Sequence, residues 1–146
     1  MILVTVTKEL LKEEEVCNSK FLSEFIQSNL EMFPAEKSTP PWVGYLAKDG
    51  GRYVGACAFK SVPTEVGVEI AYFTFPEFEG KGVATQMARE LLEIAKNAGV
   101  AVVRAQTLPK VSASTKLLEK LGFSNIGSVL HPEDGEVWEW KREMGV

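Results

Sequence analysis

Apolar and polar residues follow two periods along this chain, and each period predicts one kind of element. Stretches in which apolar residues recur at every second position predict strands, whereas a recurrence every three to four residues predicts helices. The predicted strands are residues 2–7, 42–47, 53–60, 66–75, 100–105, 125–130 and 136–142. The predicted helices are one that begins at Asn18 or Ser19 and ends near Met32, one over residues 83–98 and one over residues 115–121.

Turn residues between these elements predict how the strands are connected. Asp49-Gly50-Gly51 is a hairpin signal between two strands, and residues 131–135 join the last two strands in the same way. By contrast, a helix that ends at Gly99 lies between the strands at 66–75 and 100–105, which predicts a parallel crossover. We therefore expect an α+β fold with a mostly antiparallel, mixed central sheet.

Composition narrows the class of protein. The chain has 146 residues, of which 45% are hydrophobic, so we expect one domain over residues 1–146 with a sizeable core. A net charge of -4 and a pI near 5.2 argue against nucleic acid or a membrane surface as the partner. Cys17, Cys57 and a single histidine provide neither a disulfide framework nor the spacing of a metal site. Because no secretory or membrane-spanning pattern occurs, we expect a cytoplasmic protein.

Residues 79–85, Glu-Gly-Lys-Gly-Val-Ala-Thr, join an apolar strand to an amphipathic helix and are the most informative stretch. Gly80 and Gly82 allow a close backbone approach to a ligand, and the first N–H groups of a helix have no intrahelical partner. Together with the charge of Lys81, this pattern predicts an anion-binding turn. A dinucleotide fingerprint would need glycine at Thr85, and no P-loop sequence occurs in the chain.

Residues 79–84 resemble the Q/R-x-x-G-x-G/A segment with which GCN5-related N-acetyltransferases (the GNAT family) bind the pyrophosphate of acetyl-CoA, although Glu79 stands at the first position. Residues 107–123 are similar to the T-L-P-x-N-x-x-S stretch and the E-K-L-G-F ending of the ribosomal-protein N-terminal acetyltransferases, with Val111 at the Asn position. Together with residues 69–72, the resemblance covers roughly residues 42–142.

The resemblance implies a GNAT-like sheet flanked by helices, in which strands four and five splay to admit the pantetheine arm. It also implies acetyl-CoA as the co-substrate. The implied coenzyme contacts are Phe73, Thr74, Phe75, Glu79, Gly80, Lys81, Gly82, Val83, Ala84, Thr85, Ser114 and Lys116. Lys116 and Lys120 lie one helical turn apart, so they either meet the 3′-phosphate of the coenzyme or are ordinary surface lysines.

Glu69 is the candidate general base. It is the only charged residue in the apolar stretch 66–73, and burial makes a carboxylate a better proton acceptor. The resemblance supports this role, because the histone acetyltransferase branch of the family carries its catalytic Glu in a similar context. The alternative is a structural or solvent-facing carboxylate. On an ideal strand Tyr72, three residues later, faces the opposite side.

The resemblance also assigns a second catalytic residue, Ser114, as the group that meets the sulfur of the coenzyme. Many members of the family carry a tyrosine acid further along this helix, where this chain has Leu118. The alternative for Ser114 is a simple helix N-cap, since serine is a common capping residue.

Two functions are open on this basis. The favoured one is an acetyl-CoA-dependent N-acetyltransferase that acts on a primary amine by direct transfer in a ternary complex, with the acceptor bound over residues 33–42. The alternative is a non-catalytic acyl-CoA-binding or regulatory module on the same fold, because Glu79, Val111 and Leu118 depart from the family pattern. The acceptor is a peptide N-terminus, a lysine or a small amine, and formation of a homodimer stays open.

Overall fold

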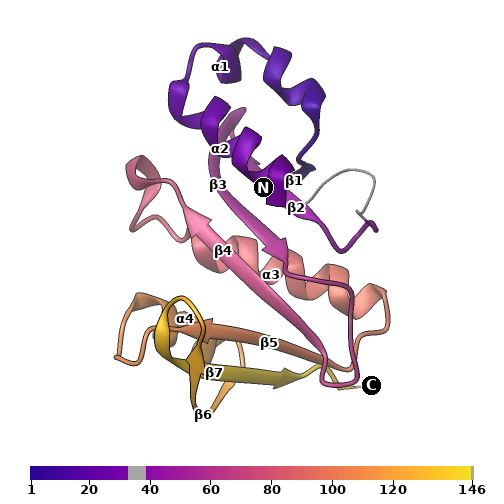
Figure 1. Ribbon diagram of the computed structural model, residues 1–146, viewed down its shortest axis with the longest axis vertical. Coiled ribbons are helices and arrows are strands. Elements are labelled where there is room, and N and C mark those ends of the chain that lie inside the picture. Colours follow the sequence, from indigo (N-terminus) through magenta and orange to yellow (C-terminus); the bar gives the residue numbers. More distant parts are fainter. Residues whose placement is uncertain (33–38, 146) are drawn as a thin grey trace.

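The structure is a computed structural model and describes residues 1–32 and 39–145. Seven strands of the described residues form one sheet in the order β1-β2-β3-β4-β5-β7-β6 (Figure 1). The strands are β1 (Ile2–Thr5), β2 (Gly44–Asp49), β3 (Arg52–Phe59), β4 (Val68–Thr74), β5 (Val102–Thr107), β6 (Ser124–His131) and β7 (Gly135–Glu143). Each strand overlaps a stretch that the sequence predicts as a strand.

Neighbouring strands pair antiparallel except at the centre of the sheet, where β4 and β5 run parallel. This parallel pairing is short: only Val68–Val103 and Glu69–Arg104 are partners, although both strands continue for several residues. Beyond these two pairs β4 and β5 diverge (Figure 1). The mixed sheet with one parallel crossover and a splay between strands four and five is therefore confirmed.

The period of three to four residues predicts three helices, α2 (Lys20–Met32), α3 (Val83–Asn97) and α4 (Ala113–Lys120), and all three form. Ser19 caps α2 by accepting a hydrogen bond from the N–H of Leu22 at 3.1 Å. The pattern does not predict the short elements η1 (Lys8–Lys12), α1 (Glu14–Cys17) and η3 (Pro76–Phe78). One or two turns are too short to show a period, so these elements appear only in the folded chain.

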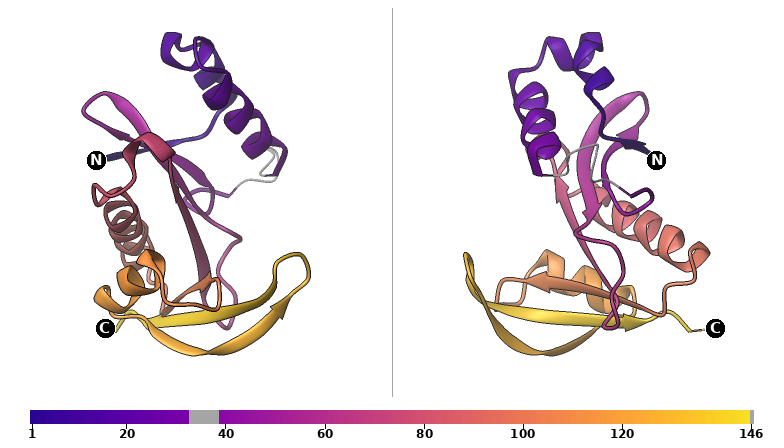
Figure 2. Two further views of the ribbon diagram at one scale, coloured as in Figure 1. Left: turned by 90° about the vertical axis from the view of Figure 1, so that its left-hand side faces the viewer. Right: turned by 45° about the vertical axis from the view of Figure 1, so that its right-hand side comes forward.

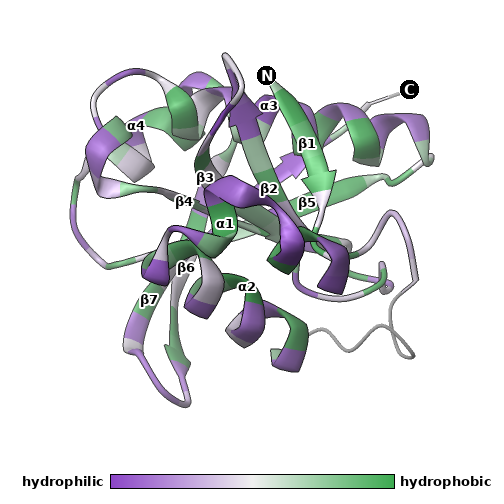
Figure 3. Ribbon diagram, turned by 90° about the horizontal axis from the view of Figure 1, so that it is seen from above, coloured by the Kyte–Doolittle hydropathy of each residue, from purple (hydrophilic) through white to green (hydrophobic). Residues whose placement is uncertain are grey.

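α2 and α3 lie on opposite sides of the sheet (Figure 2), and each buries an apolar face against it. On one side, Met87, Leu91 and Ala95 of α3 recur at every fourth position, are fully buried and pack against β3 and β4. On the other side, Leu22 and Ile26 of α2 form a second core with residues of β2 and β3. Figure 3 shows both hydrophobic and hydrophilic residues on these helices, as expected for amphipathic helices on a sheet.

The α2 side of the sheet is covered unevenly. α1 and α2 cover the N-terminal strands and reach β4 at Phe73, whose ring lies 6.2 Å from that of Phe25. Further along the sheet, the same face of β4, β5 and β7 carries the polar side chains Glu69, Arg104 and Glu139. A binding site on this side would therefore have an apolar part under α2 and a charged part beyond it. Within residues 1–32 and 39–145, no helix is long and apolar enough to cross a membrane.

Candidate active site

A pocket of about 760 Å³ lies between the end of β4, the turn that leads into α3, and the first half of α4. Its lining residues are Tyr72, Phe73, Thr74, Glu79, Gly80, Gly82, Val83, Ala84, Thr85, Ala113, Ser114, Lys116, Leu117 and Lys120. The structure thus brings together every predicted coenzyme contact except Phe75 and Lys81. We call this pocket the coenzyme pocket.

The turn from Gly80 to Gly82 has a backbone shape that favours glycine at both ends. The two φ angles are 77° and 79°, in the left-handed region, and a Cβ at either position would meet no other described atom within 4 Å. Gly82 is the N-cap residue of α3, and no side chain of the described residues caps the helix there. The first N–H groups of α3 are therefore left to bind an anion in the pocket.

Phe75 and Lys81 lie outside the pocket lining, which departs from the prediction for these two residues. Phe75 is 4% exposed and belongs to the second core, where the rings of Phe21 and Phe25 pack edge-on at 5.0 Å and 5.6 Å. Lys81 is exposed, and its ammonium lies 5.8 Å from the centre of the Phe78 ring. Phe75 therefore supports the end of β4, and Lys81 adds positive charge near the turn.

Ser112, and not Ser114, caps α4. The Ser112 hydroxyl accepts a hydrogen bond from the N–H of Thr115 at 3.3 Å, and the Thr115 hydroxyl accepts one from the N–H of Ser112 at 2.9 Å. This reciprocal pair is a capping box. The alternative explanation of Ser114 as the N-cap is therefore wrong, because the cap is formed by Ser112 and Ser114 is the second residue inside the helix.

The Ser114 hydroxyl instead meets a residue of β4. Its Oγ lies 2.9 Å from the phenol oxygen of Tyr72, and both residues line the coenzyme pocket. β4 pairs with β3 in continuous register, so Tyr72 faces away from Glu69 as the strand period predicts. Burial raises the pKa of the Tyr72 phenol, while the hydrogen bond to Ser114 acts in the opposite direction. The phenol is therefore protonated at neutral pH.

Tyr72 is the site residue that the sequence does not single out. The one local signal is a phenol within an apolar strand, three residues after the candidate base. Its partner Ser114 lies 42 residues later in the chain, so no local pattern connects the two. Leu118, at the position where the family resemblance places a tyrosine in many members, is fully buried and has no proton to donate.

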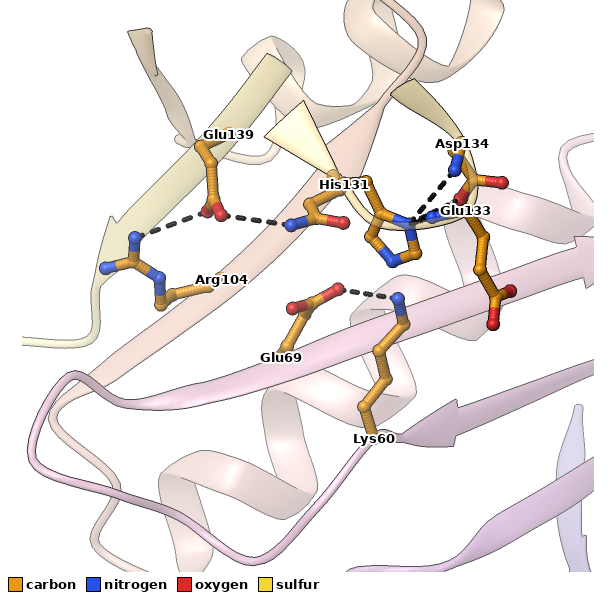
Figure 4. A network of polar contacts seen from close by, with 8 residues as sticks. Lys60, Glu69, Arg104, His131, Glu133, Asp134 and Glu139 are labelled. Carbon is orange, nitrogen blue, oxygen red and sulfur yellow. Dashed lines mark hydrogen bonds and ion pairs between the residues drawn. The ribbon is translucent and has the colours of Figure 1, made fainter. Parts of the chain in front are cut away.

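Glu69 lies on the opposite face of β4 and pairs with Lys60 (Figure 4). The Lys60 ammonium is 2.8 Å from Glu69 Oε2, and the two side chains are 45% and 26% exposed, respectively. Among the described residues, this ion pair is the only partner of that buried oxygen, because no hydrogen bond of good angle reaches it. Glu69 is also the last residue of β4 that pairs with β5, so its carboxylate lies where the splay begins.

A second ion pair lies beside Glu69 on β5 and β7. Glu139 accepts hydrogen bonds from Arg104 at 3.2 Å and from Gln106 at 3.0 Å, and its side chain is 14% exposed. Arg104 is the register partner of Glu69 across the short parallel pairing. Figure 4 shows the two carboxylates with their separate cationic partners. Each carboxylate on this part of the sheet is thus balanced by one positive charge.

A smaller pocket of about 240 Å³ lies between α2, β3 and β4. Its mostly apolar lining is formed by Phe25, Asn29, Met32, Ala56, Cys57, Ala58, Lys60, Ala71, Tyr72 and Phe73. Tyr72 and Phe73 line both pockets, so the two pockets meet at β4. We call this second pocket the α2 pocket. Residues 33–38, the larger part of the predicted acceptor loop, lie outside the described residues.

Comparison with known protein families gives one match that covers well over half of the chain. The family described as the acetyltransferase (GNAT) domain matches residues 10–124. A search of curated proteins gave no match.

Three solved structures illustrate the likeness in fold. The ribosomal L7/L12 α-N-protein acetyltransferase RimL is 16% identical, with a TM-score of 0.74 over 99% of this chain and 93% of that one. A ribosomal-protein-alanine N-acetyltransferase from Brucella melitensis is 15% identical, with a TM-score of 0.67 over 98% and 99% of the two chains. The microcin C7 self-immunity acetyltransferase MccE, solved with acetyl-CoA and AMP, is 19% identical, with a TM-score of 0.65 over 84% and 69%. At these identities the likeness shows a shared fold.

Proposed function

The chain belongs to the GNAT family of N-acetyltransferases, and on this premise we propose that it transfers the acetyl group of acetyl-CoA directly to a primary amine in a ternary complex. The observation that carries the proposal is the meeting of the coenzyme pocket and the α2 pocket at Tyr72 and Phe73. An amine held in the α2 pocket can reach a thioester held in the coenzyme pocket through the splay between β4 and β5.

The coenzyme pocket supports acetyl-CoA as the donor. Its glycine turn offers backbone N–H groups to the pyrophosphate, and Lys116 and Lys120 of α4 offer positive charge to the 3′-phosphate. Between the glycine turn and α4, the edge of β4 that faces β5 has no paired strand beyond Glu69. The backbone N–H and C=O groups of this edge are therefore available to the amides of the pantetheine arm. This arrangement brings the thioester end next to Tyr72 and Ser114. MccE, which shares the fold, was solved with acetyl-CoA.

Direct transfer is favoured over an acetylated enzyme, because the cysteine nearest to both pockets is a poor nucleophile. Cys57 lines the α2 pocket but is 4% exposed. Burial, with a smaller contribution from the charge of Glu90, raises the pKa of its thiol to about 12. Such a thiol is protonated at neutral pH, whereas the thiolate is the form that attacks.

We assign the base to Glu69 acting through water. Three residues of extended strand separate Glu69 from Tyr72, which is about 10 Å, and the two side chains face opposite sides of β4. Glu69 therefore does not reach an amine that attacks a thioester beside Tyr72, and a bridging water has to carry the proton. The Glu69 side chain is 26% exposed and is held by Lys60 at 2.8 Å, so its carboxylate has lone pairs available to accept from such a water.

A base that acts through water over this distance suits an acceptor amine that is already partly deprotonated near neutral pH. An α-amino group has a reference pKa of about 8 and a lysine one of about 10.4, so far more of the α-amine is neutral at pH 7. We therefore favour the N-terminus of a peptide as the acceptor, with a small or apolar first side chain against Phe25 and Ala71 of the α2 pocket. The shared fold with two ribosomal-protein acetyltransferases supports the same direction.

Release of free thiol from acetyl-CoA tests this function. The acceptor panel consists of peptides with a free N-terminus, N-terminally blocked peptides with one lysine, and small amines. We expect thiol release with the first group at neutral pH and much slower release with the second. A panel without any thiol release would favour the non-catalytic acyl-CoA-binding module.

Thermal unfolding tests the coenzyme assignment separately. Acetyl-CoA at about 100 times its Kd should stabilise the fold by roughly 2.7 kcal/mol, because it binds the native state only. NAD and ATP at the same concentration should have little effect, since the glycine turn matches neither of their binding fingerprints. No shift at millimolar acetyl-CoA would contradict the assignment of the pocket.

A further inference from the structure

We propose that Tyr72 is a positioning residue that passes a proton through Ser114 to the leaving sulfur of the coenzyme. The proposal rests on the function proposed above and extends it to a residue of β4. Its starting point is the contact of 2.9 Å between the Tyr72 phenol and the Ser114 hydroxyl, inside the coenzyme pocket.

The contact joins two elements that the local structure does not oblige to meet. Ser112 and Thr115 already satisfy the start of α4, so the Ser114 hydroxyl is not needed as a cap. The other polar side chains of the lining are Thr74 at the end of β4, Glu79 and Thr85 at the glycine turn and the start of α3, and Lys116 and Lys120 further along α4. Tyr72 also lines the α2 pocket, so the hydrogen-bonded pair of Tyr72 and Ser114 lies at the end of the coenzyme pocket where the α2 pocket joins it.

Either hydroxyl can donate in this contact, and the proposed path requires Tyr72 to be the donor. A serine hydroxyl has one hydrogen to donate and two lone pairs that accept. If Ser114 donated to Tyr72, it would have no hydrogen left for the sulfur. If Tyr72 donates to Ser114, the Ser114 hydrogen is available to the sulfur and the phenol can replace it. The reference pKa of a phenol is about 10 and that of a thiol about 8.5, whereas an aliphatic alcohol is a far weaker acid.

The proton balance of the transfer closes with this pair. The amine nitrogen forms the C–N bond to the acetyl carbon and gives up its surplus proton to Glu69 through water. The C–S bond then breaks, and the sulfur keeps the bonding electrons. The sulfur takes the Ser114 proton, and Ser114 takes the Tyr72 proton. As the products leave, the tyrosinate recovers a proton from solvent and Glu69 releases to solvent the proton that it took from the amine. The raised pKa of Tyr72 keeps the phenol protonated before each transfer.

Few titratable groups surround the pair. Cys57 of β3 is the register partner of Tyr72, and with a thiol pKa of about 12 it stays neutral over the working range. Glu79, Lys116 and Lys120 are the charged residues that line the coenzyme pocket. A titration of bound coenzyme below pH 10 therefore reports on the coenzyme thiol with little interference from Cys57.

The first test measures the thiol pKa of bound coenzyme A, without any acceptor. The ultraviolet absorbance of the thiolate is followed against pH in the complex with coenzyme A, and the complex with desulfo-coenzyme A is subtracted to remove protein thiols. A hydrogen bond from Ser114 stabilises the thiolate, so the wild-type complex should show a lower thiol pKa than free coenzyme A. Tyr72→Phe and Ser114→Ala should each raise it by about one unit.

The double variant tests whether the two residues act as one path. In Tyr72→Phe/Ser114→Ala the thiol pKa should rise no further than in the more affected single variant, because residues of one path are not additive. Tyr72→Phe should also lower kcat by about tenfold, with the Kd of acetyl-CoA within twofold of wild type. Tyr53→Phe is the matched control: it removes a phenol that donates to Glu13 at 2.6 Å in the second core, and it should change neither quantity.

An equal thiol pKa in wild type and Tyr72→Phe would overturn the proposal, and so would additive effects in the double variant. Failure of the proposed function has a different signature. Thiol release that is absent with every amine, while Tyr72→Phe still raises the thiol pKa, would support the proton path and contradict the transfer. A wild-type protein that does not bind coenzyme A would overturn both.

Discussion

The two faces of β4 differ in the kind of polar group that they present. The face toward α4 carries Tyr72 and the coenzyme pocket, where Tyr72 and Ser114 form a pair of hydroxyls and the charged lining residues belong to the glycine turn and α4. The face toward α2 carries Glu69, and there the polar groups are paired charges, Lys60 with Glu69 and Arg104 with Glu139. β4 thus separates the hydroxyl pair of Tyr72 and Ser114 from two ion pairs.

This difference matches what each face has to do in an acetyl transfer. A coenzyme rich in phosphate is held by many fixed donors, whereas the removal of a proton from an amine needs a group whose charge changes. Substitutions on the α4 side of β4 should therefore change the affinity for acetyl-CoA or the fate of the sulfur. Substitutions on the α2 side should change kcat or stability and leave that affinity alone.

Glu69→Gln should give the largest effect and the clearest separation of the two faces. The change keeps the shape of the side chain but removes the base, so kcat should fall by about 10²–10⁴ while the Kd of acetyl-CoA stays the same. The loss of kcat should become smaller as pH rises, because more of the amine is then already neutral when it binds. This change should occur near pH 8 for an α-amine and nearer pH 10 for a lysine. The measurement is kcat against pH with both acceptors.

Glu139→Gln is the control for this experiment, since Glu139 is the neighbouring paired carboxylate of the same face. It should lower kcat by less than about tenfold. An unchanged kcat in Glu69→Gln over the whole pH range would show that Glu69 is a structural carboxylate.

Gly82→Val should give the next largest effect, and it should change the Kd of acetyl-CoA where Glu69→Gln changes kcat. The φ angle of 79° is strained for any residue with a Cβ, and the new side chain would stand in the space that faces the phosphates. The Kd of acetyl-CoA should rise at least about tenfold, which calorimetry would measure.

Gly99→Val is a matched control for the strain itself. Gly99 follows the other end of α3, also with a φ of 79° and with no described atom within 4 Å of a Cβ. Both variants should lose about 1–2 kcal/mol of stability. Only Gly82→Val should lose affinity, and wild-type affinity in a folded Gly82→Val protein would mean that the phosphates bind elsewhere.

Lys60→Met should lower stability without changing the coenzyme affinity. Removal of the ammonium leaves Glu69 Oε2 without its 2.8 Å partner, but Lys60 is 45% exposed and water screens the loss. We expect a decrease of about 1 kcal/mol in the free energy of unfolding by urea. For comparison, Lys141→Met breaks an exposed pair of 3.6 Å with Glu143 and should cost only a few tenths of a kcal/mol. Equal decreases in the free energy of unfolding for the two variants would mean that the ion pair of Lys60 and Glu69 contributes no more than an exposed one.

Glu79→Gln should give the smallest effect, and in the favourable direction. Removal of a negative charge from the lining of the coenzyme pocket should leave the Kd of acetyl-CoA unchanged or lower it by up to about fivefold, and less at high salt. Glu77→Gln is the control, because Glu77 is near in sequence but pairs with Arg52 at 3.6 Å outside the pocket lining. Weaker binding by Glu79→Gln would show that the carboxylate makes a favourable contact.

The sequence by itself determined the regular elements and the glycine turn. Alternation of apolar residues is an intrinsic property of a half-buried strand such as β5, whereas the exposed β6 was located by the hairpin turn that follows it. All seven strands were located, with bounds that differ by a few residues. The positive φ angles of Gly80 and Gly82 are equally local, since they follow from the residue type and the start of a helix. The parallel crossover also follows from the order of strand, helix and strand.

The sequence did not determine which of two nearby residues takes a given structural role. Ser112 and Ser114 have the same capping chemistry, and which of them caps α4 depends on where the helix begins, a boundary that a pattern locates only within a residue or two. The same limit affects Phe75, which is adjacent to lining residues in the sequence but turns into the second core.

The tertiary structure alone decided the partners of the catalytic candidates. Ser114 meets Tyr72 because the packing of α4 brings its first turn against the splayed end of β4, 42 residues earlier. Glu69 meets Lys60 because two antiparallel strands end in register at that point. Such contacts depend on the direction and packing of side chains that are distant in the chain, and the spacing of residues along one element carries no information about them.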